Sequence, residues 1–560
     1  MWALYGKGWP LSSWPKGHWH LLAAAANQHG LMLARSPREC YTGSRLAGVE
    51  ELVAILGVVF SAAALLVALF GANAFLLCCL YLRRRAETVP DPSPCPEWPP
   101  VTVQLPVYNE IHVVSHLIDA VARLEYPRDR LQIQVLDDST DETTQVARER
   151  VLRHRAGGLD IELLHRSDRD GFKAGALANG LRGARGEYVA VFDADFVPPP
   201  DFLVRTVPHL VADQRLAFVQ TRWGHLNERS SALTRAQALA LDGHFVVEHL
   251  ARNLNGLVVN FNGTAGVWRR AAIEEAGGWH SDTLTEDVDL SFRAQLAGWR
   301  ALYLPEVVAP AELPPQVAAF RRQQARWATG AAQCLVKLGG SLLRGALSTR
   351  EAEGKEPRAP LSWPARLEGL MHLSVWIAHP MSLVLLLLTP LMLAGQIPLT
   401  ANLSIFWLAA LGPICAYAVS QRRLHSDWRA RMLYMPVLAL MGTGLALSNT
   451  VAIAQGLAGR RTPFRRTPKF GLEGHAGRRA GSRYVLPFQW IVVGELAMAG
   501  YALATTAFAV SVGHLFSVPF LLLYVGGYGY LGIQGVLDAW PGWRPHPQPR
   551  RTSVVESKAE

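Results

Sequence analysis

The chain has 560 residues, half of them hydrophobic and 18% charged, and a formal net charge of +10. Its length excludes a single small domain, and this apolar balance is typical of a protein partly embedded in a membrane. The positive charge would also suit nucleic acid, but the basic residues cluster beside apolar segments, as in residues 83–85 and in the loop 458–486. That placement favours a membrane protein over a nucleic-acid-binding one.

The N-terminal region predicts one membrane anchor. Residues 1–50 lack the pattern of a cleavable signal peptide, and we interpret them as an N-terminal tail or as an over-extended gene start. Residues 51–82 are nearly uncharged and long enough to cross a hydrocarbon core of ~30 Å. Three arginines follow at once, so the linker 83–100 and the domain after it are expected on the cytoplasmic side.

Short apolar runs alternate with helical stretches from residue 101 to residue 335. The runs predict strands at 101–108, 131–138, 161–166 and 188–196, with helices over 112–124 and from about 141. This alternation indicates parallel β-α-β units, a Rossmann-like α/β fold with ligands at the carboxyl ends of the strands. Three runs end in polar residues, namely Asn109-Glu110, Asp137-Asp138 and Asp193-Ala194-Asp195. A binding site is therefore expected at that edge.

The segment 336–540 is predicted to hold interfacial helices and a transmembrane channel region, followed by a C-terminal tail over 541–560. Apolar runs lie at roughly 370–395, 403–420, 432–457, 487–511 and 515–537. Arginine-rich loops flank the third run, so a full crossing there would place one of them outside. We therefore interpret 432–457 as a re-entrant or interfacial helix pair, broken near 442–444, and expect about five spans with the anchor.

Asp193 and Asp195 form an Asp-x-Asp motif after an apolar strand. Mg²⁺ and Mn²⁺ prefer carboxylate oxygens supplemented by phosphate and water. An isolated triplet of this kind is more often a surface turn, and its position at a strand end favours the metal site.

Two further motifs can carry chemistry. In Thr285-Glu286-Asp287 the acidic residues either stabilise a helix start through its dipole or place Asp287 as a general base. Gln323, Arg326 and Trp327 share one helix face, where an Arg can bind diphosphate and a Trp can stack on a sugar ring. The alternative for this second motif is a helix docked on the membrane surface.

The ordered motifs, taken together, resemble the processive family 2 glycosyltransferases, the superfamily of cellulose synthases and of cellulose-synthase-like mannan and glucomannan synthases. The resemblance implies a GT-A fold and an inverting, metal-dependent transfer. It rests on QLPVYNE at 104–110, QVLDDSTDET at 134–143, GFKAGAL at 171–177, FDADF at 192–196, FNGTAGVWRR at 261–270, TEDVDLSFRAQLAGWR at 285–300 and QQARW at 323–327.

The resemblance also implies residue roles. It makes Asp287 the base and Asp193 and Asp195 the metal ligands, with Mg²⁺ or Mn²⁺ as cofactor. Phe172 stands where several relatives have histidine, which weakens the expected nucleotide contact there. The remaining roles are nucleotide-sugar binding for Asp138, Lys173, Asp193 and Arg326, the acceptor and channel entrance for Gly263, Thr264, Glu286, Gln323 and Trp327, and a gating loop with Phe464, Thr467, Pro468 and Lys469.

The expected function is transfer of a hexose from UDP-glucose or GDP-mannose to a growing β-1,4-mannan, glucomannan or β-glucan, with translocation of the product. The protein would be a multi-pass protein of the inner or plasma membrane, in contact with lipids and without a nucleic-acid partner. One alternative is a non-processive transferase acting on a lipid acceptor. Another is a non-catalytic membrane scaffold or transporter.

Overall fold

In the computed structural model, the first described element is one long helix, α2 (Arg38–Arg84). It starts before residue 51, where the membrane anchor was expected to begin. Its part Glu51–Arg84 is apolar and long enough to cross a membrane. The described residues are 38–87, 89–90, 92, 95, 97–347, 359–395, 406–460, 467, 469–471 and 488–539.

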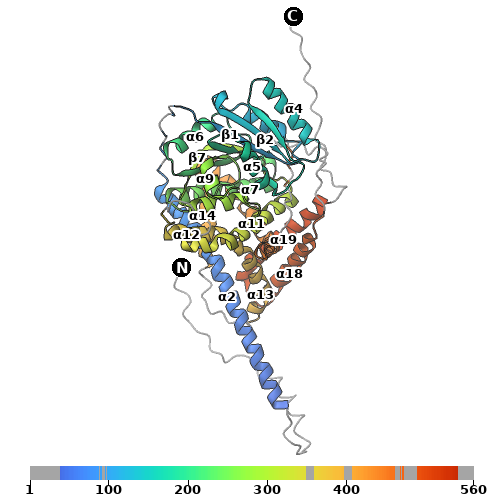
Figure 1. Cartoon of the computed structure of the whole chain (residues 1–560). Helices are drawn as coiled ribbons and strands as arrows, with labels where there is room; N and C mark the ends of the chain where they lie inside the picture. The colour runs from blue at the N-terminus through green and yellow to red at the C-terminus, as the bar shows by residue number, and fades with distance from the viewer. Residues whose placement is uncertain are drawn as a thin grey trace, which may run out of the picture. The chain divides into compact units, whose positions relative to one another are not determined.

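A seven-stranded sheet forms the α/β domain (Figure 1), in the order β3-β2-β1-β4-β6-β5-β7. The first four strands pair in parallel, as predicted. β6 is antiparallel to both of its neighbours, so the sheet is mixed rather than wholly parallel. This arrangement is the predicted GT-A fold. The strands are β1 (Val101–Val107), β2 (Leu131–Asp137), β3 (Ile161–His165), β4 (Tyr188–Val191), β5 (Leu216–His225), β6 (Gly266–Arg269) and β7 (Arg300–Ala311).

Helices cover both faces of the sheet. Alternate residues of β1, from Val101 to Val107, pack against α3, α4 and α6 on one face, as the two-residue period of a strand requires. Leu136, Val189 and Phe218 pack against α5, α9 and α10 on the other face. These helices are α3 (Val114–Val121), α4 (Thr143–Ala156), α5 (Phe172–Gly183), α6 (Phe202–Ala212), α9 (Arg270–Glu275) and α10 (Glu286–Leu296).

Between β5 and β6, α7 (Ala232–Gly243) continues through a π-helical turn, η3 (His244–His249), into α8 (Leu250–Leu254). After β7, α11 (Val317–Arg344) packs against α10, α12, α17 and α19. The later helices are α12 (Trp363–Ser374), η4 (Val375–Ile377), α13 (Ala378–Leu393), α14 (Phe406–Leu424), α15 (Trp428–Arg431), η6 (Met432–Tyr434), α16 (Met435–Gly444), α17 (Ala446–Leu457), α18 (Ile491–Ser511), η7 (Leu515–Ser517) and α19 (Val518–Ala539).

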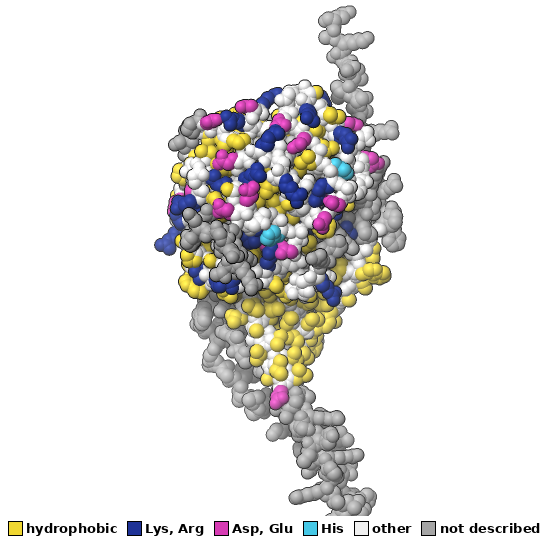
Figure 2. Space-filling model, viewed as in Figure 1, with side chains coloured by type: hydrophobic (Ala, Val, Ile, Leu, Met, Phe, Trp, Pro, Cys, Tyr) yellow, Lys and Arg dark blue, Asp and Glu magenta, His cyan; other side chains and the backbone are white. Residues whose placement is uncertain are grey.

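Four helices within the described residues are long and apolar enough to cross a membrane: Glu51–Arg84, Trp363–Leu393, Ile491–Ser511 and Leu515–Ala539. Hydrophobic side chains gather on their exposed surfaces, whereas charged side chains are spread over the α/β domain (Figure 2). Trp428–Gly444 and Ala446–Leu457 form a pair bent by 45°. The predicted break near 442–444 is therefore present. Counting the pair as one span gives five, whereas the predicted five left this pair out and included 403–420.

The predicted span at 403–420 has a different setting. Residues 403–405 lie outside the described residues, and α14 is not among the four apolar candidates. The side-chain amide of Gln421 on α14 donates a 2.8 Å hydrogen bond to buried Asp242 on α7. Tyr417 packs where a Cβ on Gly243 would stand. α14 is thus docked on the α/β domain.

Candidate active site

A cavity of about 180 Å³ opens at the carboxyl ends of the strands, between the α/β domain and α11. Its wall is built from residues as far apart in the sequence as Pro106 and Lys469. Phe464 and Pro468 lie outside the described residues. The predicted residues that line the cavity are Asp138, Lys173, Asp193, Asp195, Gly263, Glu286, Asp287, Gln323, Arg326, Trp327, Thr467 and Lys469.

Asp138 follows β2 and is held by an arginine that the sequence analysis missed. Nε of Arg166 donates to one carboxylate oxygen at 2.8 Å, and Nη2 donates to the other at 2.6 Å. Nη2 also donates to the carbonyl oxygen of Phe172. Because both carboxylate oxygens are engaged, the Asp138 side chain has one fixed orientation at the cavity wall.

Tyr108 and Arg169 form a stacked pair beside Asp138. The guanidinium carbon of Arg169 lies 3.3 Å from the centroid of the Tyr108 ring and 5.0 Å from that of Phe172. Gly171 and Phe172 both have positive φ, 70° and 51°, which turns the chain sharply before α5. Phe172, which stands where several relatives have histidine, thus gives the Arg169 guanidinium an aromatic neighbour.

The Asp-x-Asp carboxylates each pair with a lysine. Nζ of Lys173 lies 2.6 Å from Oδ1 of Asp193 and donates to the carbonyl oxygen of Gly263 at 2.8 Å. Burial would lower the pKa of Lys173, but the carboxylates of Asp193 and Glu286 outweigh it and raise that pKa. Nζ of Lys469 lies 2.5 Å from Oδ2 of Asp195. The ammonium groups of Lys173 and Lys469 thus lie at carboxylate oxygens, which are the hard donors that a divalent cation prefers. The Asp-x-Asp residues therefore fit such a cation.

Asp287 lies in the first turn of α10, with its carboxylate beside Gly263. Burial and the neighbouring Glu286 raise the pKa of Asp287 to about 7, although the Lys173 ammonium opposes them. A carboxylate with a pKa near neutrality can accept a proton from a hydroxyl better than an ordinary aspartate, so the position suits a general base.

Gly263 provides the first test of this geometry. Its φ is +81°, and a Cβ there would stand 2.7 Å from Oδ2 of Asp287. We expect Gly263→Ala to displace the carboxylate and lower turnover by roughly 10- to 100-fold, since small misplacements of a reacting group are costly. The matched control is Gly256→Ala, where φ is +64° and no atom lies within 4 Å of the added Cβ. Equal activity of the two variants would contradict the proposed contact.

Thr264 does not line the cavity. It is fully buried, and its hydroxyl accepts a 2.9 Å hydrogen bond from the backbone N–H of Asp193. The FNGTAG loop therefore sets the position of the Asp-x-Asp motif through Thr264, whereas its neighbour Gly263 faces the cavity.

Gln323, Arg326 and Trp327 lie on α11 and all three border the cavity. Their i, i+3, i+4 spacing places them on one helix face, as predicted. The cavity thus has acidic groups from the sheet on one side and the polar, aromatic face of α11 on the other.

Residues 469–471 dock beside Asp195 through Glu312, which follows β7. The carboxylate of Glu312 accepts hydrogen bonds from the backbone N–H groups of Phe470 and Gly471, the latter at 2.8 Å. Nζ of Lys469 donates to the Glu312 carbonyl oxygen at 3.1 Å. The segment predicted to gate the site therefore contacts the Asp-x-Asp motif directly.

Several lining residues were not predicted: Tyr108, Arg169, Trp223, His225, Asn262 and Glu312. Tyr108 lies in the motif QLPVYNE and Asn262 in FNGTAGVWRR, so both could have been found from the motifs that carry the resemblance. Trp223 lies on β5 and Glu312 comes directly after β7, two strands that the sequence analysis did not identify. Recognising those two strands would have placed both residues at the same edge of the sheet.

Residues 99–330 match the family model described as "Glycosyltransferase like family 2". Probable glucomannan 4-beta-mannosyltransferase 7 of Oryza sativa subsp. japonica is 45% identical over 251 residues, 44% of this chain and 43% of that protein. Glucomannan 4-beta-mannosyltransferase 7 of Arabidopsis thaliana is 43% identical over 251 residues, 44% of this chain and 45% of that protein.

Glucomannan 4-beta-mannosyltransferase 1 of Oryza sativa subsp. japonica is 44% identical over 263 residues, 46% of this chain and 50% of that protein. The chain spans about half the length of the curated relatives it matches. Among solved structures, the mannosyltransferase PcManGT from Pyrobaculum calidifontis in complex with GDP-Man and Mn²⁺ matches with a TM-score of 0.45 and 23% identity, over 70% of this chain and 99% of that one.

Proposed function

We propose that this chain, whose residues 99–330 form a family 2 glycosyltransferase domain, transfers a hexose from a nucleotide-diphosphate sugar to a growing β-glycan and moves the product across a membrane. The observation that carries the proposal is the meeting of Asp193, Asp195 and Asp287 with Trp327 around one cavity. The relatives are glucomannan 4-beta-mannosyltransferases, which supports mannose from GDP-mannose as the donor sugar.

The proposed reaction is a single displacement. The Asp287 carboxylate takes the proton of the acceptor hydroxyl, the hydroxyl oxygen bonds to the anomeric carbon, and the nucleoside diphosphate leaves with the electron pair of the broken bond. Trp327 offers its ring to the terminal sugar of the acceptor, which holds the attacking hydroxyl in place. Arg326 and Lys173 supply positive charge for the diphosphate.

Asp193 and Asp195 are proposed to hold a divalent cation, Mg²⁺ or Mn²⁺. When bound, such an ion neutralises charge on the diphosphate leaving group. Binding there requires Lys469 to leave Asp195 or to share it, because its ammonium lies 2.5 Å from Oδ2. Lys469 is thereby placed to contact the diphosphate when the segment closes.

The proposed location is a membrane with the α/β domain on the cytoplasmic side, where nucleotide sugars are made. The four apolar helices support a location in the membrane, and the arginines 83–85 at the end of the first of them support the cytoplasmic side. Tagging the C-terminus and testing its access to a protease in sealed vesicles would check this orientation.

A donor screen tests the function. Full-length protein in nanodiscs with Mn²⁺ is given GDP-mannose or UDP-glucose, and nucleotide release and product length are measured. We expect GDP release and a β-mannanase-sensitive polymer. A glycolipid carrying one sugar would favour the non-processive alternative. No release from either donor by the wild type would contradict the proposal.

The pH profile should report the base. A protonated Asp287 cannot accept the acceptor proton, and its pKa is raised to about 7. We therefore expect the transfer rate to fall tenfold per pH unit below about 7 and to level off above it. Nucleotide affinity, measured over the same range, is the control. A rate that stays constant down to pH 5 would exclude Asp287 as the titrating base.

A further inference from the structure

One face of α11 continues beyond the residues that line the cavity. Gln323, Arg326 and Trp327 are followed on the same face by positions 330, 333, 334 and 337, because steps of three and four residues repeat along an α-helix. All four of these positions contact the segment 284–289, which carries Glu286 and Asp287. The face of α11 that borders the cavity, here called the acceptor face, therefore also contacts the segment 284–289, here called the base segment.

The first three contacts are close, and two of them are polar. A Cβ on Gly330 would stand 2.4 Å from Cγ2 of Thr285, so glycine at this position lets the Thr285 side chain pack directly on the backbone of α11. The side-chain oxygen of Gln333 accepts a 2.8 Å hydrogen bond from the backbone N–H of Leu284. Sγ of Cys334 lies 3.5 Å from the Thr285 hydroxyl.

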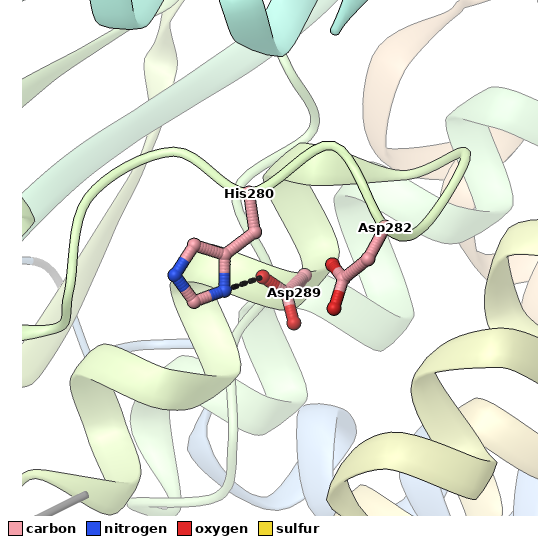
Figure 3. Close-up of side chains that lie close together, drawn as sticks. All are labelled: His280, Asp282 and Asp289. Carbon is pink, nitrogen blue, oxygen red and sulfur yellow. Dashed lines mark ion pairs between the residues drawn. The ribbon is translucent and has the colours of Figure 1, made fainter.

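The fourth contact is an ion network. His280, Asp282 and Asp289 point toward one another (Figure 3), and their ligand atoms lie within 4.8 Å of each other. This spacing would suit a metal ion, but the ammonium of Lys337 takes the position. It lies 2.8 Å from Asp289, 2.8 Å from Asp282 and 3.0 Å from Nδ1 of His280.

Asp289 is the centre of the network and has no solvent exposure. Its other oxygen lies 2.7 Å from Nη2 of Arg293 and accepts from Nε at 2.8 Å. Burial, together with the charges of Arg293 and Lys337, lowers the pKa of His280. A neutral His280 accepts from Lys337 through Nδ1 and donates through Nε2 to the carbonyl oxygen of Gly277. Separating Lys337 from Asp289 would leave one oxygen of this buried carboxylate without its cation, while Arg293 would still hold the other.

We infer that Lys337 is a positioning residue. Its ammonium group, bound by Asp289, Asp282 and His280, fixes the base segment against the acceptor face of α11. The inference rests on the proposed function. Lys337 is outside the cavity lining, whereas its partner Asp289 lies two residues beyond Asp287 on α10. The Lys337–Asp289 contact therefore sets the distance between the proton acceptor and the sugar held by Trp327.

Lys337→Met tests the inference, because methionine keeps an unbranched side chain that is one atom shorter and removes the charge. We expect transfer to the glycan to fall by roughly 10- to 100-fold, in line with the cost of a small misplacement. The donor dissociation constant should stay within about twofold, since Asp138 and the Asp-x-Asp motif lie on other elements. The control is Arg185→Met, which removes an exposed partner of Asp160 on the surface of the domain.

Chemical rescue separates positioning from a loss of folding. Lys337→Ala lacks the three carbons and the ammonium of propylammonium, so that cation should restore transfer, whereas propanol should not. A second pair of variants is Gly330→Ala, which meets Thr285, and Gly339→Ala on the same helix, where the nearest atom is 3.8 Å away. Only Gly330→Ala should lose transfer.

Unchanged transfer in Lys337→Met, or an equal loss of transfer and of donor binding without rescue, would overturn the inference while leaving the proposed function intact. A wild-type protein that binds donor but transfers no sugar would overturn both.

Discussion

Asp287→Asn is expected to abolish sugar transfer, with a loss on the order of 10²–10⁴ in rate, while nucleotide binding is retained. Asparagine has nearly the same shape and can still sit beside Gly263, but its amide cannot accept the acceptor proton. The expected separation of binding from turnover follows from the site, because Asp138 and the Asp-x-Asp motif follow β2 and β4, whereas Asp287 lies on α10.

Nucleotide affinity would be measured by calorimetry or fluorescence in nanodiscs, and turnover by nucleotide release with an acceptor glycan. Asp201→Asn is the matched control, since Asp201 is an exposed residue paired only across one helical turn with Arg205. Turnover within threefold of the wild type would remove Asp287 from the mechanism. A parallel loss of affinity would assign it to donor binding instead.

The first half of the sheet could be predicted from the sequence because its strands are buried apolar runs bounded by polar residues. Val101 to Val107 alternate between faces, and Tyr188 to Val191 are wholly buried. β5 and β7 escaped prediction for physical reasons. β5 ends in the half-buried run Arg222 to His225, and β7 contains Pro305 and Pro310. Proline lacks an N–H donor and argues against a strand, although β7 lies at the sheet edge, where it is tolerated.

The site was predicted best where a motif places its residues on one element. Gln323, Arg326 and Trp327 follow from helical spacing alone, and the cavity borders all three. Arg166 and Lys337 were out of reach, because each acts through a partner 28 or 48 positions away in the sequence and neither stands in a recognisable pattern. Long-range ion pairs depend on how elements pack, which periodicity does not report.

Arg321→Met is expected to destabilise the protein by about 3–5 kcal/mol, the typical cost of leaving one partner of a buried ion pair alone. Arg321 is 2% exposed and lies on α11, two residues before Gln323, and its Nη2 is 2.7 Å from Oε2 of Glu495 on α18. The same nitrogen donates to the carbonyl oxygen of Leu531 on α19. Arg321 therefore joins α11 to two of the apolar helices, α18 and α19.

Removing both charges should cost much less than removing one. In Arg321→Met/Glu495→Leu no charge is left buried, and apolar replacements of such pairs are often neutral or stabilising. Unfolding in mixed detergent micelles would measure each variant, with Arg185→Met, which breaks an exposed pair with Asp160, as the control. Additive losses in the double variant would show that the two side chains do not interact. If the double variant is stable but makes shorter glycan, the pair also transmits the position of α11 to the helices that we propose the product passes.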